Sequence, residues 1–302
     1  MRKVVAVVGP NASGKSHYAV QLARFFHGEI VSADSRQVYK RLDLGTGKIT
    51  REEMLGIPHH LIDIIEPDEN YSLFDFQRDA YSAIDSIRDN NRLPIIAGGT
   101  GLYIAAVTEG YQLLDVEPDP VSRLELEKCA IDQLTDIIRR EQPGALDCIE
   151  NPNKRRLVRA IEIIRAGFDY KDTRKKSKQL GALVIGVKWE KDILHRRISE
   201  RLHGRLGKGM IEEVENLRAG GVSDEFLFKM GLEYRAILRY LQGGYHSREH
   251  FIESLEIAIR QFAKRQMTWF RGRSGITWID GTDLMSASTT DNIRLFLESE
   301  TQ

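Results

Sequence analysis

Hydrophobic and polar positions in the first hundred residues follow a pattern that switches between strand and helix. Short runs rich in apolar residues at 4–8, 29–33 and 93–97 have the length of buried strands. Between them, apolar residues recur at helical spacing after residue 15 and again from Phe76 to Ile87. Because strands that alternate with helices form parallel sheets, this segment predicts an α/β fold with a parallel sheet flanked by helices.

The pattern changes near residue 115, where Pro118 and Pro120 interrupt the chain. Helical stretches follow to about Gly167, and a polar, basic run then continues to Gln179. Residues 183–188 have the pattern of a strand that returns to the sheet. The sequence therefore predicts a core formed by residues 1–113 and 180–302, with a small helical domain inserted at 114–179.

Helical spacing dominates the remaining chain. The periodicity predicts helices at about 192–202, 210–219, 232–241 and 247–270, followed by a possible edge strand at 276–279. We find no internal repeat and no low-complexity tract in the sequence.

The first strand leads directly into a phosphate-binding loop of the G-x-x-x-x-G-K-[ST] pattern. Such a loop places backbone N–H groups and a helix N-terminus around one anion, so we expect it to bind a diphosphate or triphosphate. Lys15 supplies a positive charge, and the Ser16 hydroxyl is a candidate ligand for Mg²⁺. The predicted binding residues are Gly9, Pro10, Asn11, Ala12, Ser13, Gly14, Lys15 and Ser16.

Two polar turns follow the next two strands. Asp34 comes after the strand at 29–33, and Gly98-Gly99-Thr100-Gly101 follows the strand at 93–97. Ligands of parallel sheets bind beyond the carboxyl ends of strands, so we expect Asp34 near the phosphate loop. A nucleotide hydrolase more often carries a magnesium-binding Asp after the later strand. Its absence there disfavours a simple ATPase.

Composition is that of a globular protein, with 41% hydrophobic and 29% charged residues. The sequence has no run of about 18 apolar residues and no signal-peptide pattern before the first strand. We therefore expect no membrane association and a cytoplasmic location. The two cysteines lack the spacing of a zinc or redox site, and the adjacent His59 and His60 have no third ligand near them in the sequence.

The net charge is zero, but the charges are unevenly distributed along the chain. Residues 154–178 contain ten Lys or Arg and three acidic residues, a formal charge of +7. Residues 260–273 contain five basic residues and no acidic one, interleaved with Phe262, Trp269 and Phe270. Basic segments that contain aromatics are typical of RNA binding, although a solvated helix face has the same charge count.

Four blocks of sequence resemble the tRNA dimethylallyltransferase family, also called tRNA isopentenyltransferases. The blocks are residues 32–40 (SADSRQVYK), 58–63 (PHHLID), 98–103 (GGTGLY) and 263–271 (AKRQMTWFR). The resemblance covers residues 4 to about 271 in the expected order. The sequence has no C-terminal zinc-finger spacing, so it is more similar to the compact bacterial type.

This resemblance implies an activity and a site. The family transfers a dimethylallyl (isopentenyl) group from dimethylallyl diphosphate to the exocyclic amino group of the adenosine 3′-adjacent to the anticodon in tRNA, and releases diphosphate. It implies a P-loop NTPase-like core that uses Mg²⁺ and whose loop holds the leaving diphosphate. Asp34 would be the general base, Thr100 would assist near the amine, and Lys15 and Arg201 would stabilise the leaving group.

The resemblance also implies tRNA contacts from the core and from the insert. The matched residues are Asp34, Ser35, Arg36, Gln37, Thr100, Arg123, Arg155, Arg156, Arg159, Lys264, Arg265 and Gln266. The expected partners are therefore tRNA and dimethylallyl diphosphate, and we expect a monomer.

Several positions depart from the family pattern. Asn11 stands where Thr is common, Arg205 where Met is usual, and Ile259 where Thr is frequent; residues 231–235 (GLEYR) replace a Gly-Tyr-Lys/Arg-Glu type. Two other functions also fit the phosphate loop. A small-molecule or nucleoside kinase would turn over ATP without RNA, and an RNA-binding ATPase would show RNA-stimulated hydrolysis.

Overall fold

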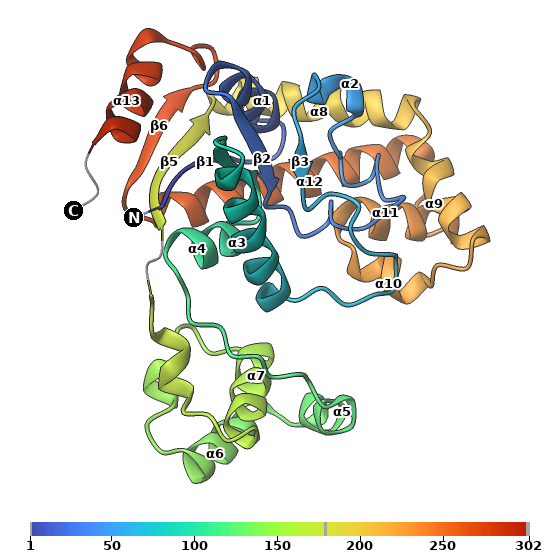
Figure 1. Ribbon diagram of the computed structural model, residues 1–302. Coiled ribbons are helices and arrows are strands. Elements are labelled where there is room, and N and C mark those ends of the chain that lie inside the picture. The colour runs from blue at the N-terminus through green and yellow to red at the C-terminus, as the bar shows by residue number, and fades with distance from the viewer. Residues whose placement is uncertain (1, 178–179, 300–302) are drawn as a thin grey trace. The chain divides into compact units, whose positions relative to one another are not determined.

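Six parallel strands form one sheet in the order β3-β2-β4-β1-β5-β6 (Figure 1). The computed structural model describes residues 2–177 and 180–299. The strands are β1 Arg2–Val8, β2 Gly28–Ser32, β3 His59–His60, β4 Leu93–Gly98, β5 Leu180–Lys188 and β6 Ile276–Asp280. The predicted parallel α/β sheet is confirmed. The segment at 276–280 pairs only with β5 and is an edge strand, as the pattern indicates.

Side chains of the sheet alternate between two buried faces. Val4, Ala6 and Val8 of β1 pack against α3 and α4, whereas Val5 and Val7 pack against α1 and α13. The helices that cover the sheet are α1 Lys15–Phe25, α3 Leu73–Asp89, α4 Gly101–Thr108 and α13 Ala287–Glu298. Both faces of the sheet are covered, which explains why its strands are continuous apolar runs rather than alternating ones.

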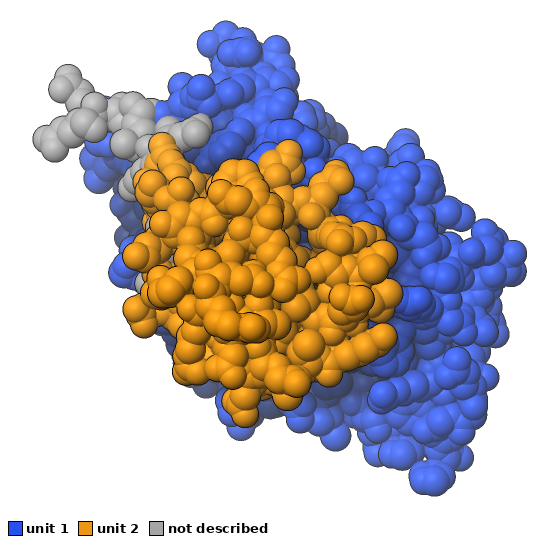
Figure 2. All heavy atoms as spheres, turned by 90° about the horizontal axis from the view of Figure 1, so that it is seen from below, with its two compact units in different colours: residues 1–108, 180–302 blue, residues 109–179 orange. Residues whose placement is uncertain are grey.

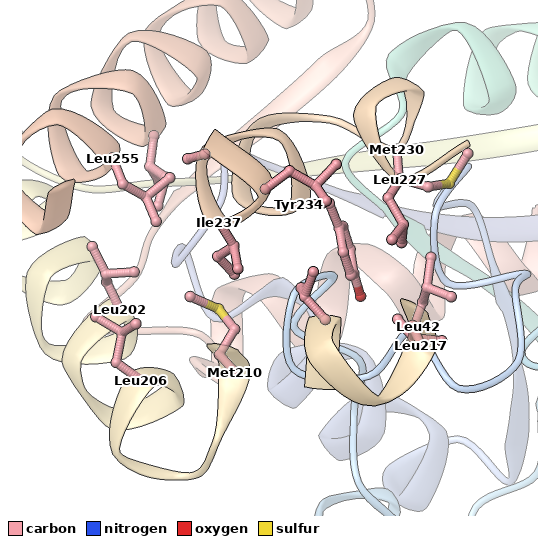
Figure 3. Close-up of a cluster of buried hydrophobic side chains, with 14 of the residues drawn as sticks. Leu42, Leu202, Leu206, Met210, Leu217, Leu227, Met230, Tyr234, Ile237 and Leu255 are labelled. Carbon is pink, nitrogen blue, oxygen red and sulfur yellow. The ribbon is translucent and has the colours of Figure 1, made fainter. Parts of the chain in front are cut away.

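A helical layer, which the sequence predicts in part, packs beside the sheet on its own core (Figure 3). Its helices are α8 Lys191–Gly207, α9 Met210–Ala219, α10 Asp224–Lys229, α11 Leu232–Leu241 and α12 Arg248–Arg271. The bounds of α9 and α11 match the periodicity, while α8 runs five residues beyond the predicted end at 202. Leu42, from the long β2–β3 connection, is fully buried in this core, so that connection is anchored to the helices. The short helix α2 Arg51–Met54 lies within the same connection.

Residues 109–179 form a second compact unit, and residues 1–108 and 180–302 form the first (Figure 2). The second unit contains α5 Pro120–Lys128, α6 Ile131–Glu141 and α7 Lys154–Arg165, with short 3-10 turns at Leu146–Cys148 and Tyr170–Arg174. Its own core includes Leu134, Leu157 and Ile161. The unit begins at residue 109, earlier than the 114 expected from the prolines. Lys178 and Gln179 of the predicted basic segment lie outside the described residues.

The Tyr18 hydroxyl has no hydrogen-bond partner among the described residues, although this side chain of α1 is fully buried. Burial also raises the pKa of this phenol. A buried, unsatisfied hydroxyl costs about 1–3 kcal/mol. We therefore expect Tyr18→Phe to increase the free energy of unfolding by about 1 kcal/mol in urea denaturation.

Tyr234 provides the matched control, because it is equally buried but its hydroxyl donates to Glu213 at 2.7 Å. Tyr234→Phe should therefore lower the free energy of unfolding. A Tyr18→Phe variant less stable than the wild type would contradict the prediction and would indicate that the hydroxyl is satisfied in solution.

Candidate active site

The phosphate loop connects β1 to α1 and has the backbone that its glycines permit. Gly14 adopts φ +86°, in the left-handed region, and is the N-cap of α1 without a side-chain cap. A Cβ on Gly9 would lie 2.8 Å from Ser13 Oγ, so this position has no room for a side chain. Ser13 Oγ is buried and has no partner in the described parts of the chain. The N-terminus of α1 is therefore uncapped and open to an anion.

A pocket lies beside this loop, at the carboxyl ends of β2 and β4. Six of its lining residues belong to the predicted site: Asn11, Lys15, Ser16, Asp34, Gln37 and Arg201. The others are Ala19, Ile30, Ser32, Thr46, Ile49, His59, Ile62, Ala97 and Gly98. One cavity thus brings the loop together with the Asp34 carboxylate, which follows β2, and a guanidinium from α8.

Lys15 is the most strongly perturbed cation of this pocket. Its side chain is buried, and this burial, together with the positive charge of Arg201, lowers its pKa from 10.5 to about 8; Asp34 acts in the opposite direction. Among the described residues, its Nζ donates only one hydrogen bond, a long one of 3.4 Å to the carbonyl oxygen of Pro10. A desolvated ammonium with so weak a partner favours an incoming anion.

Asp34 is held in a short polar network. Its Oδ1 accepts the backbone N–H of Arg36 at 2.9 Å, and the Thr100 hydroxyl accepts the backbone N–H of Ser35 at 3.1 Å. The strand ends approach closely because Gly98 has no side chain: a Cβ there would lie 2.1 Å from the carbonyl oxygen of Ala33. The two polar turns therefore meet, as the topology predicts, and Thr100 fixes the backbone next to Asp34.

Gln266 joins the phosphate loop to the Gly98–Gly101 turn. Its Oε1 accepts the backbone N–H of Asn11 at 2.8 Å, and its Nε2 donates to the carbonyl oxygen of Gly99 at 3.0 Å. Gln266 is buried, whereas its neighbours Lys264 and Arg265 are exposed on α12. The structure thus places Gln266 as a bridge between two loops, within a block whose sequence predicts only tRNA contact.

Three arginines one turn apart on α8 face the loops around the pocket. Arg197 Nε donates to the carbonyl oxygen of Ala12 at 2.8 Å, and Arg201 Nη2 donates to that of Gly47 at 2.7 Å. The Arg201 side chain keeps accessible surface because it lines the pocket. Protein atoms around it nevertheless displace much of its water, and this desolvation, together with the adjacent Arg205, lowers the pKa of Arg201. The guanidinium still remains protonated at neutral pH.

The donor set of the pocket suits a hard divalent cation bound together with a phosphate. The Ser16 hydroxyl and the Asp34 carboxylate both line it, and oxygen donors are the ligands that Mg²⁺ prefers. Within residues 2–177 and 180–299, no three His, Cys, Asp or Glu side chains gather into a group that could hold a metal ion by themselves. A metal here would therefore depend on the ligand's own oxygens.

His59 and Thr46 line the pocket but are not among the predicted site residues. His59 Nδ1 lies 2.8 Å from the carbonyl oxygen of Ile57, and burial lowers the pKa of its imidazole, which keeps the ring neutral. The pairing of β3 with β2 brings His59 to this place, and a two-residue strand has no recognisable periodicity. The sequence block at 58–63 was the only signal that could have identified it.

Comparisons with known proteins agree over almost the whole chain. The family model described as "IPP transferase" matches residues 37–273, and one described as "Isopentenyl transferase" matches residues 2–65. A protein named tRNA dimethylallyltransferase 2 from Pelobacter propionicus is 44% identical over 92% of this chain and 90% of that protein. The chain belongs to the IPP transferase family.

Solved structures give the same family. The full-length tRNA isopentenylpyrophosphate transferase of Bacillus halodurans is 37% identical, with a TM-score of 0.74 over 99% of this chain and 97% of that one. A eukaryotic dimethylallyltransferase acting on tRNA has a TM-score of 0.83 at 24% identity, which supports the fold alone. The P-loop NTPase-like fold expected from the sequence is thus confirmed for this IPP transferase.

Two of the predicted tRNA-binding arginines pair with one buried carboxylate of the second unit. Arg123 and Arg159 both pair with Glu162, at 2.6 and 3.1 Å. The Glu162 side chain is 4% exposed, while the two arginine side chains are 37% and 36% exposed. One carboxylate therefore stabilises two guanidiniums whose outer surfaces remain accessible to a phosphate backbone.

Arg155 and Arg156 lie side by side at the start of α7, and both are exposed. Arg156 donates to the carbonyl oxygens of Glu150 and Asn151. Arg155 makes no hydrogen bond or ion pair within the described part of the chain. Their charges are therefore available at the surface, and their role in RNA binding stays a prediction.

Two departures from the family pattern contact each other. Arg205 pairs with Glu233, which lies in the unusual 231–235 segment, at 3.1 Å, and both side chains are only 13% exposed. A buried arginine needs a buried carboxylate, so the two unusual residues are physically linked.

No helix in the described ranges is long and apolar enough to cross a membrane.

Proposed function

We propose that this protein transfers a dimethylallyl group from dimethylallyl diphosphate to the exocyclic amino group of the adenosine 3′-adjacent to the anticodon in tRNA. The observation that carries the proposal is one pocket, in a member of the IPP transferase family, lined by a phosphate loop, Asp34 and Arg201. The diphosphate is the leaving group, and the loop that holds it does not need a nucleotide.

Departure of the diphosphate requires stabilisation of growing negative charge. The open N-terminus of α1, the Lys15 ammonium and the Arg201 guanidinium supply fixed positive charge around the pocket. Mg²⁺, held by Ser16 and the diphosphate oxygens, would add further charge stabilisation. Because these groups are oriented before the reaction, they need little reorganisation as the carbon–oxygen bond breaks.

The attacking amine is a weak nucleophile, since its lone pair is delocalised into the purine ring. Asp34 is assigned as the general base that accepts the amine proton as the new carbon–nitrogen bond forms. The bond from Asp34 Oδ1 to the Arg36 N–H fixes the carboxylate, and Thr100 fixes the neighbouring backbone. The orientation of the base is therefore determined by the backbone at the end of β2.

The adenine must leave the stack of the tRNA loop before it can reach this pocket. Ser35, Arg36 and Gln37 adjoin Asp34, and we assign them contacts with the extruded nucleotide. Contacts with the RNA phosphates are assigned to Arg123, Arg155, Arg156 and Arg159 of the second unit and to Lys264 and Arg265 of α12. Gln266 bridges two loops beside them. Contacts with the phosphates position the RNA without specifying its sequence.

One assay tests the activity and separates it from the two alternatives. The protein and Mg²⁺ are incubated with labelled dimethylallyl diphosphate and unmodified tRNA, and label is expected in the RNA. Turnover of ATP without RNA would support a kinase, and RNA-stimulated ATP hydrolysis without label transfer would support an ATPase. No specific observation in the structure favours either alternative. Size-exclusion chromatography tests the expected monomer.

Truncation of Arg155 and Arg156 to alanine is expected to weaken tRNA binding and to reduce its salt dependence. Each lost phosphate contact lowers the slope of log K against log salt by roughly 0.7–0.9, so removal of two should flatten it by about 1.5. A filter-binding series in increasing KCl measures both quantities. Binding of dimethylallyl diphosphate, measured in parallel, should be unchanged, and an unaltered tRNA slope would contradict the assignment.

A further inference from the structure

One wall of the pocket is a tight turn at residues 43–47, and Thr46 of this turn lines the cavity. The turn belongs to the long β2–β3 connection and lies between α8, α9 and α11. Three of its backbone N–H groups point to a single acceptor, the carboxylate of Glu213 on α9. Glu213 accepts the N–H of Asp43 at 3.0 Å, that of Leu44 at 2.6 Å and that of Gly45 at 3.0 Å.

A fourth donor fixes the carboxylate itself. The Tyr234 hydroxyl, 1% exposed, donates to Glu213 Oε1 at 2.7 Å, and burial raises the pKa of this phenol so that it remains a donor. The turn packs directly on the tyrosine ring: a Cβ on Gly45 would lie 2.4 Å from Tyr234 Cζ. The turn and the carboxylate therefore have one position relative to α9 and α11.

The carbonyl groups of the same turn are bound by the arginines of α8. Arg205 Nη1 donates to Leu44 at 3.0 Å and to Gly45 at 3.3 Å. The Gly47 carbonyl accepts from Arg201 at 2.7 Å and from Gln37 Nε2 at 3.4 Å. One peptide segment thus connects Glu213, which is not among the residues lining the pocket, to Arg201, which lines it.

We propose that Glu213 is a positioning residue for the diphosphate site. It fixes the turn at 43–47, and the Gly47 carbonyl then holds the Arg201 guanidinium toward the pocket before the donor binds. A long arginine side chain loses rotamer entropy when it is immobilised on a ligand, and this loss is smaller when the side chain is already held. The proposal rests on the proposed function, because it takes the diphosphate as the ligand of Arg201.

Glu213→Gln tests this with almost no change in volume. A glutamine amide has one acceptor oxygen, and its NH₂ group would face the N–H groups of the turn. Glu212, adjacent on α9 and exposed, provides the matched control as Glu212→Gln. The probe is dimethylallyl diphosphate with Mg²⁺, titrated calorimetrically without tRNA. We expect about tenfold weaker donor binding in Glu213→Gln, unchanged tRNA binding, and wild-type behaviour of Glu212→Gln.

A double-mutant cycle distinguishes positioning from a loss of folding. If Glu213 acts through Arg201, Glu213→Gln should weaken donor binding little further in an Arg201→Met background. The same loss in both backgrounds, or a parallel loss of tRNA affinity with a lower melting temperature, would overturn the proposal, as would unchanged donor binding in the single variant. A wild-type protein that binds no dimethylallyl diphosphate would instead overturn the proposed function.

Discussion

Replacement of Asp34 by asparagine is expected to reduce the rate of dimethylallyl transfer by roughly 10²–10⁴-fold, the range for loss of a general base. The amide oxygen can still accept the Arg36 N–H that now bonds to Asp34 Oδ1 at 2.9 Å, so the turn at the end of β2 should keep its shape. The amide cannot accept the amine proton, and it also lacks the negative charge that raises the pKa of Lys15. The rate is measured as label transferred to tRNA in a single turnover with saturating donor.

Two measurements show whether this loss belongs to the chemical step. Calorimetric binding of dimethylallyl diphosphate should be close to that of the wild type, because Asp34 does not carry the positive charge that holds the anion. An Asp34→Ala variant should be at least as inactive. Transfer at the wild-type rate in either variant would remove Asp34 from the role of base.

Loss of the Lys15 charge is expected to weaken donor binding. It should also slow dimethylallyl transfer to an extent comparable with the Asp34→Asn substitution. Removal of one preoriented group from an anionic transition state typically costs about 10²–10³-fold in rate. Lys15→Met keeps the aliphatic stem and removes the ammonium, so the phosphate loop should retain its packing. The expected result is weaker donor binding in calorimetry and slower single-turnover transfer, with tRNA affinity unchanged.

The same residue predicts a pH dependence. The pKa of Lys15 is lowered to about 8, so the protonated form predominates below this value and is lost as the pH rises through it. An anion beside the ammonium raises its pKa, so binding takes up a proton and the affinity for dimethylallyl diphosphate should fall above about pH 8. Calorimetry between pH 7 and pH 9.5 in buffers of different ionisation enthalpy measures the affinity and the proton uptake.

Lys15→Arg is the control for this profile, because a guanidinium does not deprotonate in that range. Its donor affinity should vary little between pH 7 and pH 9.5. A wild-type affinity that is equally independent of pH would contradict the assignment of a lowered lysine pKa to the binding step.

Local sequence patterns predicted the elements that carry strong periodicity. β1, β4, α9 and α11 lie where apolar residues place them, because the two strands are buried on both faces and each of the two helices buries one face. The pattern missed β3, which is two residues long, and α10, which has six. It also missed α13, whose buried residues Thr290 and Ile293 form only a narrow stripe. Such short or weakly apolar elements depend on their neighbours for stability.

The sequence by itself determined the phosphate loop, the polar turns after β2 and β4, and the family, because these depend on residue types at fixed spacing. Only the tertiary structure decided which distant side chains complete the site. Gln266 joins two loops, Glu162 pairs with Arg123, 39 residues away, and Glu213 binds a turn 168 residues away in sequence at Gly45. Hydrogen bonds and ion pairs between residues far apart depend on chain packing, and no local spacing encodes them.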